Sequence, residues 1–185
     1  MNSPQQDRAN DQVRCNVELK ARLHSLDAAR AVARNLATGQ LPDQHQIDTY
    51  FRCYQGRLKL REIAGAPAQL ISYQRPDTTE AKQSRYYLID APDPVAMLQG
   101  LTEALGILVR VEKHREIYFY ENVRIHLDRV ERLGTFLEFE AVLECETQLE
   151  QGQAVVAWLQ EQFAIQSGDL LTSSYSDMLE RATDT

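Results

Sequence analysis

Cysteine is scarce in this chain. The sequence also lacks a cysteine- or histidine-based metal-binding motif, an export signal and a membrane-spanning segment. Its three cysteines, Cys15, Cys53 and Cys145, contain no C-x-x-C pair, and the four histidines form no metal-binding pair. This excludes a disulfide framework and a typical zinc site, and it favours a reducing, cytoplasmic setting. Residues 1–11 are polar, and no apolar run approaches the length of a membrane-spanning helix. Neither export nor membrane insertion is therefore expected.

Two catalytic motifs are also missing. The sequence has no G-x-x-x-x-G-K-[ST] loop and no G-x-S-x-G elbow, so P-loop enzymes and serine hydrolases of that type are unsupported. The net charge of −7 and the pI near 5.1 oppose binding to nucleic acid or to an anionic membrane. Any site for an anionic ligand must therefore be a local cluster of basic residues.

The length of 185 residues fits a single domain with a substantial core. We expect a flexible lead over 1–12 and one domain over 13–182, with Gly39–Gln46 as a loop. Period-two patterns and turn residues predict eight strands, at 14–23, 47–54, 57–63, 69–75, 84–90, 107–119, 123–131 and 135–142. Helical spacing and caps predict four helices, at 26–38, 94–105, 151–164 and 172–182.

Charged residues alternate with apolar ones in five of these strands. In the first, Asn16, Glu18, Lys20 and Arg22 share one face. Such a face usually points to solvent in an antiparallel sheet. Here, however, basic residues gather in the middle strands and a separate acidic set forms, which suits an anionic ligand bridged to a metal.

An α+β fold with a closed, mostly antiparallel, eight-stranded barrel accounts for this pattern. Closure removes exposed edges, and helices packed outside would cover the apolar faces. The charged faces would then line a tunnel. Buried charges need water, counter-charges or a ligand, so the tunnel is expected to be a ligand site.

Several segments resemble the CYTH domain family, the triphosphate tunnel metalloenzymes. Glu18-Leu19-Lys20 is similar to the last three positions of the family's ExExK signature. Later segments resemble its phosphate-binding strands, and 123–140 is most similar to the branch of class IV adenylate cyclases. The segments that carry the resemblance are Glu18–Lys20, Arg57–Glu62, Tyr73–Pro76, Lys113–Arg115 and 123–140.

The resemblance implies roles for individual residues. Phosphate binding would fall to Lys20, Lys59, Arg61, Arg75, Lys113, Arg115 and Arg124. The residues implied in catalysis are Lys20, Arg61, Lys113, Arg115 and Asp128. Mg²⁺ or Mn²⁺ would be held by Glu18, Glu138 and Glu140. These types also suit the chemistry, since guanidinium groups match phosphate oxygens and hard carboxylates suit these ions.

Asn16 departs from the family signature, which has a glutamate at this position. The missing carboxylate should weaken metal affinity and puts turnover in question. Among the histidines only His126 shares the charged face, and we interpret it as a wall residue rather than a general base.

Three functions stay open. The first is a class IV-type cyclase that converts ATP to cyclic AMP and pyrophosphate. The second is a triphosphatase that hydrolyses inorganic triphosphate, thiamine triphosphate or a nucleotide. The third is a non-catalytic binder of such ligands. A small-molecule triphosphate is the expected partner in each, and a homodimer is an open alternative to a monomer.

Overall fold

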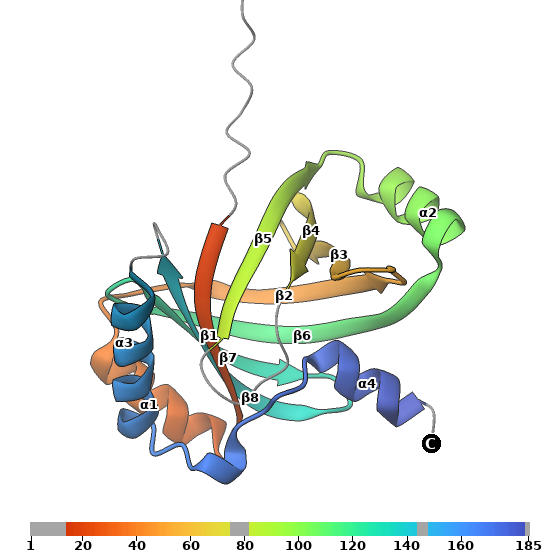
Figure 1. Cartoon of the computed structure of the whole chain (residues 1–185). Helices are drawn as coiled ribbons and strands as arrows, with labels where there is room; N and C mark the ends of the chain where they lie inside the picture. Colours follow the sequence, from red (N-terminus) through yellow and green to blue (C-terminus); the bar gives the residue numbers. More distant parts are fainter. Residues whose placement is uncertain (1–13, 75–81, 144–147, 184–185) are drawn as a thin grey trace, which may run out of the picture.

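The computed structural model describes residues 14–74, 82–143 and 148–183, so the predicted flexible lead falls outside it. It contains eight antiparallel strands and four α-helices, which confirms the α+β class and the strand count (Figure 1). The strands are β1 (Arg14–Arg22), β2 (Gly39–Phe51), β3 (Arg57–Ile63), β4 (Ala68–Gln74), β5 (Lys82–Ala91), β6 (Ile107–Tyr120), β7 (Val123–Val130) and β8 (Gly134–Leu143). The helices are α1 (Leu26–Leu36), α2 (Pro94–Leu105), α3 (Leu149–Gln162) and α4 (Tyr175–Thr183), with a short 3₁₀ turn, η2, at Ser167–Asp169. None of the helices in the described part of the chain is long and apolar enough to cross a membrane.

The strands form one strongly curled sheet. Their order is β1-β5-β4-β3-β2-β6-β7-β8. The first and last strands of this order, β1 and β8, also pair with each other, and β1 pairs with β5 on its other side. Every pairing is antiparallel. One face of the sheet therefore looks inward, and alternate residues of each strand point toward that interior.

Local signals explain where two of the helices begin and end. The Ser25 side chain accepts a hydrogen bond from the amide of Ala28 at 3.2 Å and caps α1. Asp93 caps α2 in the same way at 3.0 Å, and Pro94 occupies the first turn. Gly106 follows α2 with φ of 73°, a conformation that favours glycine.

The predicted loop over Gly39–Gln46 is wrong, because this segment is the first half of β2. It pairs with β6 from Gly39 onward, and the register shifts between Leu41 and Gln44. Pro42 lies inside this irregularity, where a missing backbone donor is tolerated. Turn-forming residues suggested a loop, but tertiary pairing extends the strand.

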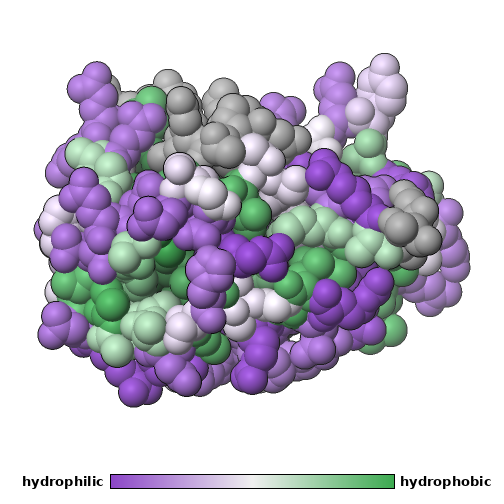
Figure 2. All heavy atoms as spheres, turned by 90° about the horizontal axis from the view of Figure 1, so that it is seen from below, coloured by the Kyte–Doolittle hydropathy of each residue, from purple (hydrophilic) through white to green (hydrophobic). Residues whose placement is uncertain are grey.

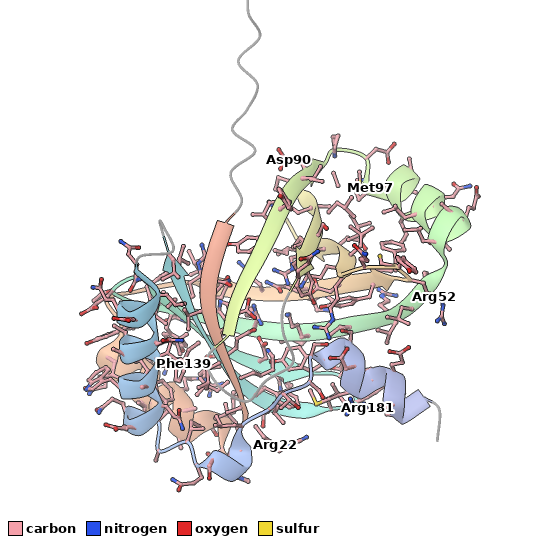
Figure 3. All side chains as sticks on the ribbon, in the orientation of Figure 1. Arg22, Arg52, Asp90, Met97, Phe139 and Arg181 are labelled. Atoms are coloured by element: carbon pink, nitrogen blue, oxygen red, sulfur yellow. The ribbon has the colours of Figure 1, made fainter. Side chains whose placement is uncertain are left out.

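The apolar faces of the strands point outward beneath the helices, as expected. Strand residues such as Val17, Leu127 and Phe139 form one buried core with Val156 and Leu159 of α3. Figure 3 shows Phe139 on the side of the sheet that α3 covers. Apolar side chains thus lie mainly on the outer face of the curled sheet, and many polar side chains lie on its inner face.

A second outer core lies under α2. Met97, Leu98 and Leu101 of this helix pack against a buried group that includes Phe51 and Leu60 (Figure 3). Seen from below, the molecular surface mixes apolar and polar residues, with hydrophilic ones prevailing at its rim (Figure 2).

The packing of α3 can be tested with a pair of leucine substitutions. Leu159→Ala removes a fully buried side chain of α3 and should cost about 2–5 kcal/mol of unfolding free energy, because a cavity remains. The matched change Leu105→Ala, at the end of α2, removes a side chain that is 38% exposed and should cost about 0.5 kcal/mol. Denaturant titration measures both. Equal losses would show that α3 is not docked as described.

Candidate functional site

The inward face of the curled sheet encloses a cavity of about 420 Å³. All eight strands contribute residues to its lining, together with Tyr175, the first residue of α4, and Ser174 before it. Six basic residues line it: Lys20, Lys59, Arg61, Lys113, Arg115 and Arg124. Three glutamates line it as well: Glu18, Glu138 and Glu140.

Glu138 is the centre of one group of charges in this cavity. Its carboxylate lies 2.9 Å from Nζ of Lys20, 2.6 Å from Nη2 of Arg115 and 3.5 Å from Nδ1 of His126. Burial alone would raise the pKa of Glu138, but Lys20 and Arg115 hold it well below its usual value. The residue is therefore an anion at any ordinary pH.

Glu140 is the centre of a neighbouring group. It accepts a hydrogen bond from Nδ2 of Asn16 at 2.6 Å and one from Nη1 of Arg124 at 3.2 Å. Nε2 of His126 lies 3.8 Å from it. His126 thus stands between the two glutamates, and burial lowers its pKa, which favours the neutral imidazole. Its position agrees with the expected wall residue.

Asp128 does not line the cavity but supports a residue that does. It is fully buried and accepts two hydrogen bonds from Arg115, both at 2.6 Å. It also accepts one at 2.8 Å from the hydroxyl of Tyr175, the first residue of α4. Burial would raise the pKa of Asp128, but Arg115 and Lys113 hold it well below its usual value. Asp128 therefore fixes the guanidinium of Arg115 in place.

The α4 helix borders one end of the cavity. The ring centroid of Tyr175 lies 4.0 Å from Nζ of Lys20 and 5.5 Å from Nζ of Lys113, distances at which a cation is attracted to an aromatic face. Asp177 binds Arg57 of β3 at 2.9 Å, and the amide of Leu171 bonds to the carbonyl of Lys20 at 2.9 Å. These contacts join α4 to β3 and the segment before α4 to β1.

The other end of the cavity is more apolar. Its lining includes Leu41 near the start of β2, and Ile117 and Phe119 in the last part of β6, which are paired with His126 and Arg124 of β7. Leu41 is paired with Ile117, four residues beyond Lys113 on β6. Four strand residues correspond to about 13 Å, so the apolar group and the α4 end are well separated.

The chemistry of the acidic end fits a hard divalent cation. Carboxylate and amide oxygens are suitable ligands for Mg²⁺ or Mn²⁺. Oδ1 of Asn16 is buried without a hydrogen-bond partner, which leaves it able to face a cation. Among the described residues, no three acidic, histidine or cysteine side chains already converge on one point. Glu138 and Glu140 are instead directed toward protein cations.

The cavity thus gathers most of the residues predicted from sequence. The six basic residues and the three glutamates named above all border it, whereas Asp128 lies behind Arg115. Arg75, also predicted to bind phosphate, lies outside the described residues. Their roles in binding and catalysis stay predictions.

Sequence reasoning missed two residues of the site. Asp48 of β2 is buried and accepts hydrogen bonds from Lys59 and Arg61. The alternation of Gln46, Asp48 and Tyr50 could have revealed it, by the same count that was applied to the other strands. Tyr175 had no such signal, because its place depends on how α4 packs.

Solved structures share this fold. A Pyrococcus horikoshii protein matches with a TM-score of 0.79 at 20% identity, covering 88% of this chain and 98% of the other. A candidate adenylate cyclase of Vibrio parahaemolyticus matches with 0.76 at 23% identity, covering 91% and 99%. A Hippeastrum protein, described as a candidate adenylyl cyclase with dominant triphosphatase activity, matches with 0.63 at 16%, covering 92% and 96%. At these identities the likeness concerns the fold.

No curated protein matches the chain. The model of the CYTH domain, in contrast, matches residues 14–175, which include every strand and every residue described above as lining the cavity. The inward-facing charges, the curled antiparallel sheet and this match agree, and the chain belongs to the CYTH domain family.

Proposed function

We propose that the protein is a divalent-metal-dependent enzyme that acts on nucleoside triphosphates, and that it converts ATP to cyclic AMP and pyrophosphate. The observation that carries this proposal is the composition of the cavity, where six cations, three glutamates and apolar side chains line one space. In this proposal the ring of strands acts as a triphosphate tunnel. Binding to ATP would use all three kinds of side chain.

The basic residues suit the triphosphate group. ATP carries about four negative charges on its phosphates, and arginine donors match phosphate oxygens in pairs. Arg115 is held by Asp128 and Arg61 by Asp48, so both guanidinium groups are oriented before a ligand arrives. Preorganised cations can stabilise the charge that develops on the phosphates without reorganising.

The apolar end favours a nucleotide over inorganic triphosphate. Leu41, Ile117 and Phe119 would give an organic group a surface to pack on, which a bare triphosphate would leave unused. Placing the phosphates among the cations would then direct the nucleoside toward this end.

The metal would be held by Glu18, Glu138 and Glu140, with Asn16 Oδ1 as an additional oxygen. When bound, a divalent ion supplies charge neutralisation and lowers the pKa of a hydroxyl that it contacts. The side chains bind and orient the phosphates, while the ribose 3′-hydroxyl gives its proton to solvent water and its oxygen bonds to the α-phosphorus. The bond from this phosphorus to the oxygen that bridges to the β-phosphate breaks, and pyrophosphate leaves. The basic residues stabilise the departing pyrophosphate.

Hydrolysis of the triphosphate is the second candidate. The cations lie on both sides of the cavity, so they do not select which phosphorus is attacked. The Hippeastrum neighbour, which is described as having dominant triphosphatase activity, adds weight to this alternative. In it, a water molecule attacks the terminal phosphorus of the same bound group. Binding without turnover is the third candidate, and the replacement of a signature glutamate by Asn16 is the feature that favours it.

Product analysis separates these functions. The protein is incubated with ATP, inorganic triphosphate or thiamine triphosphate, each with Mg²⁺ or Mn²⁺, and the products are identified by mass spectrometry. We expect cyclic AMP and pyrophosphate from ATP. Orthophosphate as the main product would favour the triphosphatase, and binding without any product would leave the binder.

Removal of one proposed metal ligand tests the acidic end. Glu140→Gln keeps the shape of the side chain but removes its charge, and we expect turnover with Mn²⁺ to fall at least about a hundredfold. Calorimetric titration should show weaker Mn²⁺ binding. The control is Glu150→Gln on the exposed surface of α3, which should change neither quantity. Full activity of Glu140→Gln at saturating Mn²⁺ would contradict the placement of the metal.

Two arginines of β7 test the basic lining. Arg124 borders the cavity, whereas Arg129 is exposed on the same strand. Arg124→Gln should weaken the binding of triphosphate about tenfold or more, because one charge-assisted hydrogen bond is lost. Arg129→Gln should leave binding unchanged. Affinity is measured from the rise in melting temperature over a series of triphosphate concentrations. Equal affinities of the two variants would exclude Arg124 from the phosphate site.

A further inference from the structure

Asp48 is a buried carboxylate among the cations that are proposed to bind phosphate. It lies on β2 and is 1% exposed. Its Oδ1 accepts a hydrogen bond from Nε of Arg61 at 2.7 Å, and its Oδ2 accepts one from Nη2 of Arg61 at 2.8 Å. Nζ of Lys59 lies 3.0 Å from Oδ2, and Nζ of Lys113 lies 3.7 Å from the same atom. Side chains from β3 and β6 thus converge on a single carboxylate of β2.

A buried carboxylate is unusual in a group of cations that is proposed to bind an anion. Three cations face one carboxylate, so the group keeps an excess of positive charge. Burial alone would raise the pKa of Asp48, but Arg61, Lys59 and Lys113 hold it well below its usual value. Asp48 therefore stays ionised, and it reduces the repulsion among cations that are close together in a poorly solvated cavity.

Asp48 also determines how Arg61 is presented. The guanidinium has five donors, and Asp48 binds two of them side by side. This bidentate contact fixes the plane of the guanidinium. Arg61 itself borders the cavity. Lys59 is held in a similar way, since its Nζ also lies 3.4 Å from the hydroxyl of Tyr50.

We propose that Asp48 is a positioning residue, which orients Arg61, Lys59 and Lys113 for the triphosphate although it repels the ligand itself. The inference rests on the proposed triphosphate function and adds to it a residue that touches no substrate. It reverses the simple electrostatic expectation that removal of a negative charge improves anion binding.

Lys113 is the cation most sensitive to this arrangement. It is faced by Arg115 from its own strand, Asp128 from β7, Asp48 from β2, Arg61 from β3 and the ring of Tyr175 from α4. Burial, with Arg115 beside it, lowers the pKa of Lys113 to about 7, while Asp128 and Asp48 oppose this shift. Loss of the Asp48 charge would lower the pKa further. Lys113 would then lose its proton, and its attraction for phosphate, at a lower pH.

The test compares Asp48→Asn with Asp43→Asn, the same change at an exposed position of β2. Affinity for inorganic triphosphate is measured by calorimetry at pH 6 and pH 8. We expect Asp48→Asn to bind more weakly at pH 8, by about tenfold for each unit by which the pKa of Lys113 falls, and to lose less at pH 6. Asp43→Asn should match the wild-type protein at both values.

The titration of Lys113 is read independently, in the protein without ligand. The chain has only four lysines, so the side-chain NMR signals can be assigned with a Lys113→Arg variant. We expect Asp48→Asn to lower the pKa of Lys113 and Asp43→Asn to leave it unchanged. An unchanged titration, or tighter binding of triphosphate by Asp48→Asn at pH 8, would overturn the proposal.

Two further outcomes are distinguishable. If Asp48→Asn does not fold, Asp48→Glu replaces it: this variant keeps the charge but displaces it, so the pKa of Lys113 should hold while triphosphate binding weakens about tenfold. Unchanged binding by Asp48→Glu would then overturn the proposal. If the wild-type protein binds no triphosphate, the proposed function fails and the positioning role fails with it, whereas the Lys113 titration still reports whether Asp48 controls this charge.

Discussion

Pairing of opposite charges across neighbouring strands is the constraint on which this structure depends. The interior of the curled sheet contains residues that are costly to bury, and a single unpaired ion would cost several kcal/mol. Asp128 pairs with Arg115 across β6 and β7, and Asp48 pairs with Arg61 across β2 and β3. Because each pair joins adjacent strands, the register of the sheet and the charge pattern of the cavity determine each other. A slip of one residue would turn the charges outward.

This pairing also clarifies how the protein can be stable without a ligand. Glu138 contacts Lys20 and Arg115, so acidic and basic residues compensate one another within the cavity. A triphosphate with a metal ion could take over both sets of contacts, with phosphates replacing the glutamate and the metal replacing the cations. Such an exchange keeps the balance of charge while the ligand enters.

Much of the fold was predictable from the sequence because its periodicity is strong. The alternation in β6 and β7 gave both the strands and the inward face, and the caps Ser25 and Asp93 located two helix starts. The first half of β2 was not predictable, since Pro42 and its polar neighbours are typical of a loop and only pairing with β6 makes them a strand. For the site, alternation identified residues such as Lys113 and Glu138, whereas Tyr175 depends on the packing of a helix that is far away in sequence.

The pairing of β1 with β8 has a consequence for folding kinetics. Cys15 is paired with Leu143 and Arg22 with Phe136, so this ladder joins segments separated by more than a hundred residues. Contacts of such long range form only after a large loss of chain entropy, and proteins rich in them fold slowly. The nascent cavity, with its strands half assembled, would expose edges and uncompensated charges during this time. Triphosphate in the refolding buffer should then act late, by slowing the unfolding of the completed sheet more than by speeding its formation.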